Sequence, residues 1–167
     1  QGHFSCSVQV SPLIGKLPEL KTSGKIFKIN FSNLSPFSIF IYFAVDPCYH
    51  YSNLSEANRN KDYTTPQSGP VLCDDELLVG WYRFVGDAGT KMPTTRVSAY
   101  RCGTDWSGWL NGAHPTLEDG EVHRTVCFSD RSAGCKYSAN ILVKNCGSYF
   151  IYILHPPSCT SRYCGTD

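Results

Sequence analysis

Nine cysteines constrain the fold of this 167-residue chain more than any other feature of its sequence. Such a number is typical of proteins held together by disulfides, which persist in oxidising compartments and not in the cytosol. Structural zinc sites commonly use Cys-x-x-Cys pairs, and none occurs here, so metal binding by the thiols is the less favoured alternative. The chain begins at Gln1 without a charged-then-apolar leader, as expected of a mature form. We therefore expect a secreted, extracellular protein.

Eight of the cysteines lie in the second part of the chain and predict four intrachain disulfides, whose pairing the sequence leaves open. They are Cys48, Cys73, Cys102, Cys127, Cys135, Cys146, Cys159 and Cys164. Cys6 then has no internal partner. An odd cysteine in a secreted chain favours a bridge between chains, and we predict a disulfide-linked, two-fold homodimer through Cys6. A buried or capped thiol is the alternative.

Short alternating segments, rich in β-branched and aromatic residues and bounded by turn residues, recur along the chain. We expect Lys25–Phe31 and Phe37–Val45 to form a hairpin around Ser32–Pro36. Further strands are predicted over Glu76–Val85, Arg96–Arg101, Glu121–Phe128, Ala139–Lys144 and Tyr149–Leu154. The predicted fold class is all-β or β-rich, β-sandwich-like and disulfide-rich. We expect an N-terminal β-hairpin extension over residues 1–45 and the main cysteine-rich module over residues 46–167.

Charge and motif content exclude several classes of function. The formal net charge is +1 and no basic block occurs, so the chain has no electrostatic footprint for nucleic acid. The longest apolar run, Phe37–Val45, is about half the length of a membrane helix, which argues against membrane insertion. No His-Glu-x-x-His or Gly-x-Ser-x-Gly motif is present. We do not expect an enzyme.

Eight motifs follow one another between residues 46 and 166. They are Gly80-Trp-Tyr-Arg-Phe-Val-Gly86, Lys91-Met-Pro93, Tyr100-Arg-Cys-Gly103, Trp109-Leu-Asn-Gly-Ala-His-Pro115, Asp119-Gly-Glu-Val122, Val143-Lys-Asn-Cys146, Tyr149-Phe-Ile-Tyr152 and Pro156-Pro-Ser-Cys-Thr-Ser-Arg-Tyr-Cys164. In type and order they resemble the eight-cysteine extracellular module of uromodulin and pancreatic glycoprotein 2.

Two departures from that module bear on function. Uromodulin's version has two further cysteines, at the positions where this chain has Arg96 and Gly134. Loss of both together is what the loss of one disulfide would produce. The glycosylated Asn through which the uromodulin module acts as a bacterial decoy is replaced by Ile153, and a second sequon is altered at Ala113. The resemblance therefore does not carry the decoy role to this chain. Sequons instead occur elsewhere, at Asn30, Asn33 and Asn53.

In its length and its predicted dimer the chain also resembles a freestanding galactose-specific, calcium-dependent lectin of the sea-anemone kind. That resemblance implies a secreted lectin with Ca²⁺ as cofactor, which recognises terminal galactose through its hydroxyls. Two sites in one dimer would cross-link galactose-terminated glycans and gain avidity.

A calcium site needs two or more carboxylates beside other oxygen donors on a tightly turned backbone. Glu118, Asp119 and Glu121 surround Gly120, and Asp105 is the fourth predicted metal ligand. An ordinary solvated turn is the alternative for these residues. The second acidic cluster, formed by Asp74, Asp75 and Glu76, is the competing metal site, although such a run is more typical of a charged strand entry.

A sugar site on this lectin would combine an aromatic platform with hydrogen-bonding side chains. Trp106 lies among small polar residues and is the predicted stacking residue, with Asn111 and His114 as polar contacts. Trp81 and Trp109 are expected to pack in the core instead. The alternative function is an extracellular structural, matrix or protein-interaction module that has no sugar site.

Overall fold

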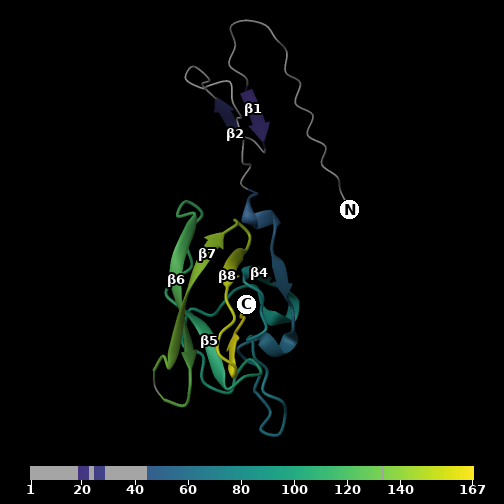
Figure 1. Cartoon of the computed structure of the whole chain (residues 1–167), viewed down its shortest axis with the longest axis vertical. Helices are drawn as coiled ribbons and strands as arrows, with labels where there is room; N and C mark the ends of the chain where they lie inside the picture. Colours follow the sequence, from purple (N-terminus) through teal and green to yellow (C-terminus); the bar gives the residue numbers. More distant parts are fainter. Residues whose placement is uncertain (1–18, 23–24, 29–44, 133) are drawn as a thin grey trace, which may run out of the picture. The chain divides into compact units, whose positions relative to one another are not determined.

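The computed structural model describes residues 19–22, 25–28, 45–132 and 134–167 (Figure 1). The chain divides into two compact units, Gln1–Phe43 and Ala44–Asp167. In the first unit, β1 (Glu19–Thr22) pairs antiparallel with β2 (Lys25–Lys28). Cys6 and the sequons at Asn30 and Asn33 lie outside the described residues, so the interchain bridge stays a prediction.

The described part of the first unit is a hairpin that was not predicted from the sequence. Lys25–Lys28 pairs with Glu19–Thr22, with Leu20 opposite Phe27. Only Ser23 and Gly24 separate the two paired segments in the sequence, and short connections of turn-forming residues close a hairpin at the smallest entropic cost. The other predicted partner, Phe37–Val45, lies outside the described residues except for Val45, so the hairpin around Ser32–Pro36 stays a prediction.

The second unit is built on one curled, seven-stranded sheet (Figure 1). Its strands, in spatial order, are β3 (Ser52–Leu54), β4 (Gly80–Phe84), β8 (Phe150–Leu154), β7 (Tyr137–Asn145), β6 (Glu121–Ser129), β5 (Trp106–Asn111) and β9 (Ser161–Tyr163). The two edge strands, β3 and β9, run parallel to their neighbours, and the other pairs are antiparallel. The β-rich class predicted from the sequence is confirmed.

Three short 3-10 helices complete the described secondary structure: η1 (Pro47–Tyr49), η2 (Ala57–Arg59) and η3 (Gly86–Ala88). No helix in the described part of the chain is long and apolar enough to cross a membrane. The strand predicted over Arg96–Arg101 is absent, because this segment ends in a sharp bend. Tyr100 and Cys102 both have positive φ angles, of 61° and 46°, which a strand does not accommodate.

The core lies against one face of the sheet. Phe84 on β4, Tyr152 on β8, Val143 on β7 and Val126 on β6 are buried, and the Phe84 and Tyr152 rings meet edge to face at 5.6 Å. We call this side the inner face. Burying such side chains contributes about 25 cal/mol per Å² of apolar area, so alternate residues of each strand are directed inward.

Three disulfides fasten the second unit. They join Cys48 to Cys146, Cys102 to Cys164 and Cys127 to Cys135. The two remaining predicted members, Cys73 and Cys159, are not bonded but bring their sulfur atoms to 3.5 Å from each other. Six of the eight cysteines thus form intrachain disulfides as expected. The fourth disulfide stays a prediction, and Cys73 with Cys159 is the one pairing left for it.

Candidate functional site

Of the three acidic residues of the predicted calcium loop, Glu118 and Asp119 lie between β5 and β6, and Glu121 is the first residue of β6. Two of the three have local partners. Asp119 Oδ2 accepts a hydrogen bond from the Thr116 backbone N–H at 2.8 Å, which lowers the pKa of that carboxyl. Glu121 forms an ion pair with Lys144 on β7 at 3.3 Å. Glu118 is exposed. Calcium binding here stays a prediction, in a loop whose geometry already suits a solvated turn.

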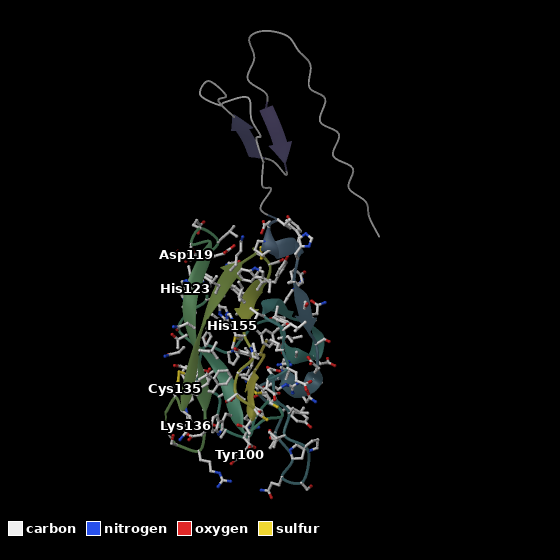
Figure 2. The ribbon with its side chains drawn as sticks, viewed as in Figure 1. Tyr100, Asp119, His123, Cys135, Lys136 and His155 are labelled. Carbon is white, nitrogen blue, oxygen red and sulfur yellow. A yellow bond between two sulfur atoms is a disulfide. The ribbon has the colours of Figure 1, made fainter. Side chains whose placement is uncertain are left out.

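Asp105, the fourth predicted ligand, does not join this loop. It lines a hollow together with Tyr100, and Figure 2 shows Tyr100 and Asp119 at opposite ends of the second unit. The physical reason is β5, which starts directly after Asp105 and carries the chain about 20 Å along the sheet before the acidic loop begins. The four carboxylates therefore do not form one site.

Asp74, the leading member of the competing acidic cluster, is a buried structural ion. Its two carboxylate oxygens accept hydrogen bonds from Arg59 at 2.7 and 2.9 Å, and Arg162 lies 3.8 Å away. The Tyr163 backbone N–H donates to the same carboxylate at 2.9 Å. Arginine and backbone donors already engage both oxygens of Asp74, which argues against a cation there, and metal binding by this cluster stays a prediction.

Cys73, Asp75 and Cys159 are, among the described residues, the one group of three potential metal ligands whose ligand atoms lie close together. The Cys73 thiol donates to Asp75 Oδ1 at 2.9 Å, and chiefly this hydrogen bond raises the pKa of Cys73 to about 11. The close sulfur atoms fit a disulfide better than a metal centre.

His114 is directed into the protein. Its Nε2 lies 2.8 Å from the Tyr152 hydroxyl, which also accepts a hydrogen bond from the Met92 backbone N–H at 3.0 Å. The Tyr152 hydroxyl has one proton and two lone pairs, so it can donate to Nε2 or accept from it, according to the tautomer of His114. Burial, with smaller contributions from Lys91 and Arg124, lowers the pKa of His114 to about 4. The predicted sugar contact is thus part of the core hydrogen bonding.

This arrangement predicts a pH-dependent stability. The unfolded chain takes up a proton on His114 near pH 6.5, whereas the folded protein does so only near pH 4. The free energy of unfolding should therefore fall as pH is lowered from about 6.5 to about 4, by about 1–2 kcal/mol once partial exposure is discounted. Urea denaturation of the parent and of His114→Gln at pH 7.5 and pH 5 checks this. An equal loss of stability in both proteins would contradict it.

The other predicted sugar residues lie apart from one another. Trp106 packs partly against the main core and lines a hollow that also contains Asp105. Asn111, at the far end of β5, is exposed and borders a different hollow beside His123. Trp109 is partly buried and donates from Nε1 to Ser129 Oγ at 2.9 Å, in keeping with its expected packing role.

Trp81 departs from its prediction as a core residue. It lies on the face of the sheet opposite the core, because Tyr82 and Phe84 are the residues of β4 that contact the core cluster. Trp81 on β4 is opposite Ile153 on β8, and Ile153 is opposite Leu142 on β7. Leu142 is in turn opposite His123 on β6. We call these four residues the outer-face row. The three apolar members are half-buried and belong to neither core cluster.

Arg83 lies two residues after Trp81 in β4, on the same face of the sheet as the outer-face row. Its guanidinium lies 3.8 Å from the centroid of the Tyr149 ring and donates to the Tyr51 hydroxyl at 3.0 Å. The apolar row is therefore flanked by a cation held rigidly on aromatic rings. Sequence reasoning missed this surface, although alternation along β4, β7 and β8 carried the signal, because it assigned apolar residues to the interior.

Comparison with known proteins identifies relatives of the second unit. A family model for the uromodulin-like cysteine-rich domain matches residues 82–165. The pancreatic secretory granule membrane major glycoprotein GP2 of Canis lupus familiaris is 45% identical over 121 residues, and that of Rattus norvegicus 43% over 124. Uromodulin of Rattus norvegicus is 41% identical over 121 residues. Each match covers 71% of this chain but only 23%, 23% and 18% of the respective relative, so the chain spans less than a quarter of their length.

Proposed function

The chain belongs to the uromodulin-like domain family, and from this premise we propose that it is an extracellular protein-interaction module. Its three disulfides fit an oxidising, extracellular environment. The partner surface in this proposal is the outer-face row. Of the alternative function weighed from the sequence, the proposal adopts the protein-interaction role, in preference to the calcium-dependent lectin.

The observation that carries the proposal is the register of Trp81, Ile153 and Leu142 across three neighbouring strands. Large apolar side chains aligned on a sheet face outside the core gain free energy when a partner covers them, by about 25 cal/mol per Å² of apolar area. Trp is also enriched among residues that dominate binding energy, and Arg83 supplies a fixed charge at the edge for orientation.

Further apolar surface adjoins β4. Leu78 and Val79, which directly precede this strand, are 81% and 61% exposed. Because both residues and Trp81 belong to one short stretch, a partner seated on the outer-face row would meet them within the same contact. A protein partner with an apolar centre and an acidic group opposite Arg83 fits this surface.

Comparative affinity capture tests the proposal. The parent, Trp81→Ser/Leu142→Ser and the control Leu117→Ser are immobilised and exposed to the extracellular fluid of the source tissue, and captured proteins are quantified by mass spectrometry. Leu117 is 60% exposed, lies in the acidic loop and is not a member of the row. We expect at least one protein to be retained by the parent and the control and reduced about tenfold or more by the double variant. Identical capture by all three proteins would reject the outer-face row as the partner surface.

The more specific function, a calcium-dependent dimer that binds galactose, stays a prediction. In its support, the acidic loop is exposed and Trp106 lies beside Asp105. Against it, Asp105 and His114 are not placed with the loop. Calorimetric titration with galactose, in calcium and in a chelator, decides the question, because binding that appears only with calcium is the defining property of such a lectin.

A further inference from the structure

A second surface lies around Tyr100, separate from the outer-face row. Two adjoining cavities of about 430 and 420 Å³ share the side chains of Tyr100, Asp105 and Arg131. The first is also bordered by the segment between Thr64 and Val71, and the second by Trp106 and Asp130. We call the two cavities together the Tyr100 hollow. We propose that the Tyr100 hollow binds a neutral polyhydroxylated ligand, the pyranose ring of a glycan, without a metal ion.

Tyr100, which lines both cavities, has a strained backbone conformation and is fixed by several hydrogen bonds. Tyr100 has a φ of 61°, a conformation that costs energy for any residue with a side chain. Its backbone N–H donates to the Asp105 carbonyl at 3.2 Å, and its carbonyl accepts from Thr65 N–H at 3.0 Å. Arg131 Nε donates to the Tyr100 hydroxyl at 2.8 Å. The ring is thus fixed at the mouth of the hollow before any ligand arrives.

The hollow contains both hydrogen-bond acceptors and donors that the described protein does not use. The Asp105 carboxylate is half-buried and has no hydrogen bond or ion pair with any described residue. Arg131 is exposed, donates through Nε, and places its guanidinium carbon 5.0 Å from the centroid of the Tyr100 ring; its two terminal nitrogens form no hydrogen bond with any described residue. Unused charged groups that line a cavity are the usual means by which a site fixes the orientation of a ligand.

The signs of these two groups select the chemistry of the ligand. A cationic ligand would be repelled by Arg131, and an anionic ligand by Asp105 and the neighbouring Asp130. A hydroxyl both donates and accepts, so vicinal hydroxyls satisfy the carboxylate and the guanidinium together without a charge conflict. The rings of Tyr100 and Trp106 add apolar area for the C–H face of the sugar.

This inference does not rest on the protein-interaction proposal, and the two fail independently. Trp81 and Leu142 belong to the outer-face row and do not line the Tyr100 hollow. The Trp81→Ser/Leu142→Ser protein should therefore bind sugar as the parent does, even if it has lost its protein partner.

Saturation-transfer NMR with the full chain tests the proposal. The probes are the methyl pyranosides of galactose, mannose and N-acetylglucosamine at millimolar concentration, in a chelator throughout. We expect at least one probe to bind, and Asp105→Ala and Arg131→Ala each to weaken it about tenfold or more. Asp87→Ala, which alters an exposed carboxylate on η3, is the matched control and should leave binding unchanged.

Three outcomes would overturn the inference. No signal with any of the three pyranosides would remove the ligand class. Equal signal in the parent and in Asp105→Ala, with both proteins giving the same dispersed spectrum, would place the sugar elsewhere. Binding that returns only when calcium is added would move the site to the loop that contains Asp119.

Discussion

Replacing Asp74 by Asn is expected to lower the free energy of unfolding by about 3–5 kcal/mol. The substitution keeps the shape of the side chain but removes the charge that faces Arg59 and Arg162, both almost fully buried. Among the described residues, Arg59 and Arg162 would then share only the Glu56 carboxylate, which is 49% exposed and lies 3.3 and 3.6 Å from them. Two buried guanidinium groups beside one half-exposed carboxylate are incompletely compensated for the water that they have lost, which is costly. The amide nitrogen would also face an arginine donor at one of the two positions where a carboxylate oxygen now accepts.

The effect should be large because Asp74 connects three segments distant in sequence. Arg59 belongs to η2, while Arg162 and Tyr163 belong to β9 at the end of the chain. The carboxylate holds all of them, and Arg59 also donates to the Tyr163 carbonyl at 3.2 Å. Losing the charge therefore loosens the edge strand as well as one ion pair.

Urea denaturation followed by tryptophan fluorescence measures this prediction. The matched control is Glu76→Gln, because Glu76 is exposed, lies two residues further on and has no ion pair with any described residue. We expect the control to stay within about 0.5 kcal/mol of the parent. An Asp74→Asn protein as stable as the control would show that the buried charges are not coupled in the way the geometry indicates.

Asp74 also shows where sequence reasoning reaches its limit. Nothing in the run Asp74-Asp75-Glu76 distinguishes a buried carboxylate from an exposed one, because its partners are 15 and 88 residues away in the chain. The strands were more accessible to prediction: Glu121–Phe128 and Tyr149–Leu154 nearly coincide with β6 and β8. Alternation is a local property, whereas the pairing of charges is set by the tertiary fold.

The Tyr100 hollow contains residues that the local sequence indicated and residues that only the tertiary fold brings together. Asp105 and Trp106 are neighbours in the sequence, and their residue types were sufficient to mark them as candidate ligands. Tyr100 was instead assigned to a strand, and Arg131 was not considered, because the bend that brings them together depends on the disulfide between Cys102 and Cys164. A site assembled from several loops is visible only after the sheet has positioned them.

Gly165→Ala is expected to destabilise the protein by about 3 kcal/mol, at the upper end for an overpacked site. A methyl group at this position would overlap the carbonyl oxygen of Ala88 and come within 2.8 Å of the Phe84 ring. The first of these neighbours is backbone, so no side-chain rotation relieves the overlap. Gly165 itself cannot retreat, because its N–H donates to the Arg59 carbonyl at 2.9 Å and its carbonyl accepts from Lys61 at 2.8 Å.

Gly80→Ala is the matched control for Gly165→Ala. Gly80 lies in β4, and the nearest atom to an added methyl group there is 4.0 Å away, on the flexible Tyr82 side chain. Alanine also restricts the unfolded chain more than glycine, so this variant should be as stable as the parent or more stable, by up to about 1 kcal/mol. Thermal and urea denaturation of both variants provide the comparison. If Gly165→Ala lost no more stability than Gly80→Ala, the close packing of the chain end against η3 would be refuted, and with it the rigid edge on which Asp74 depends.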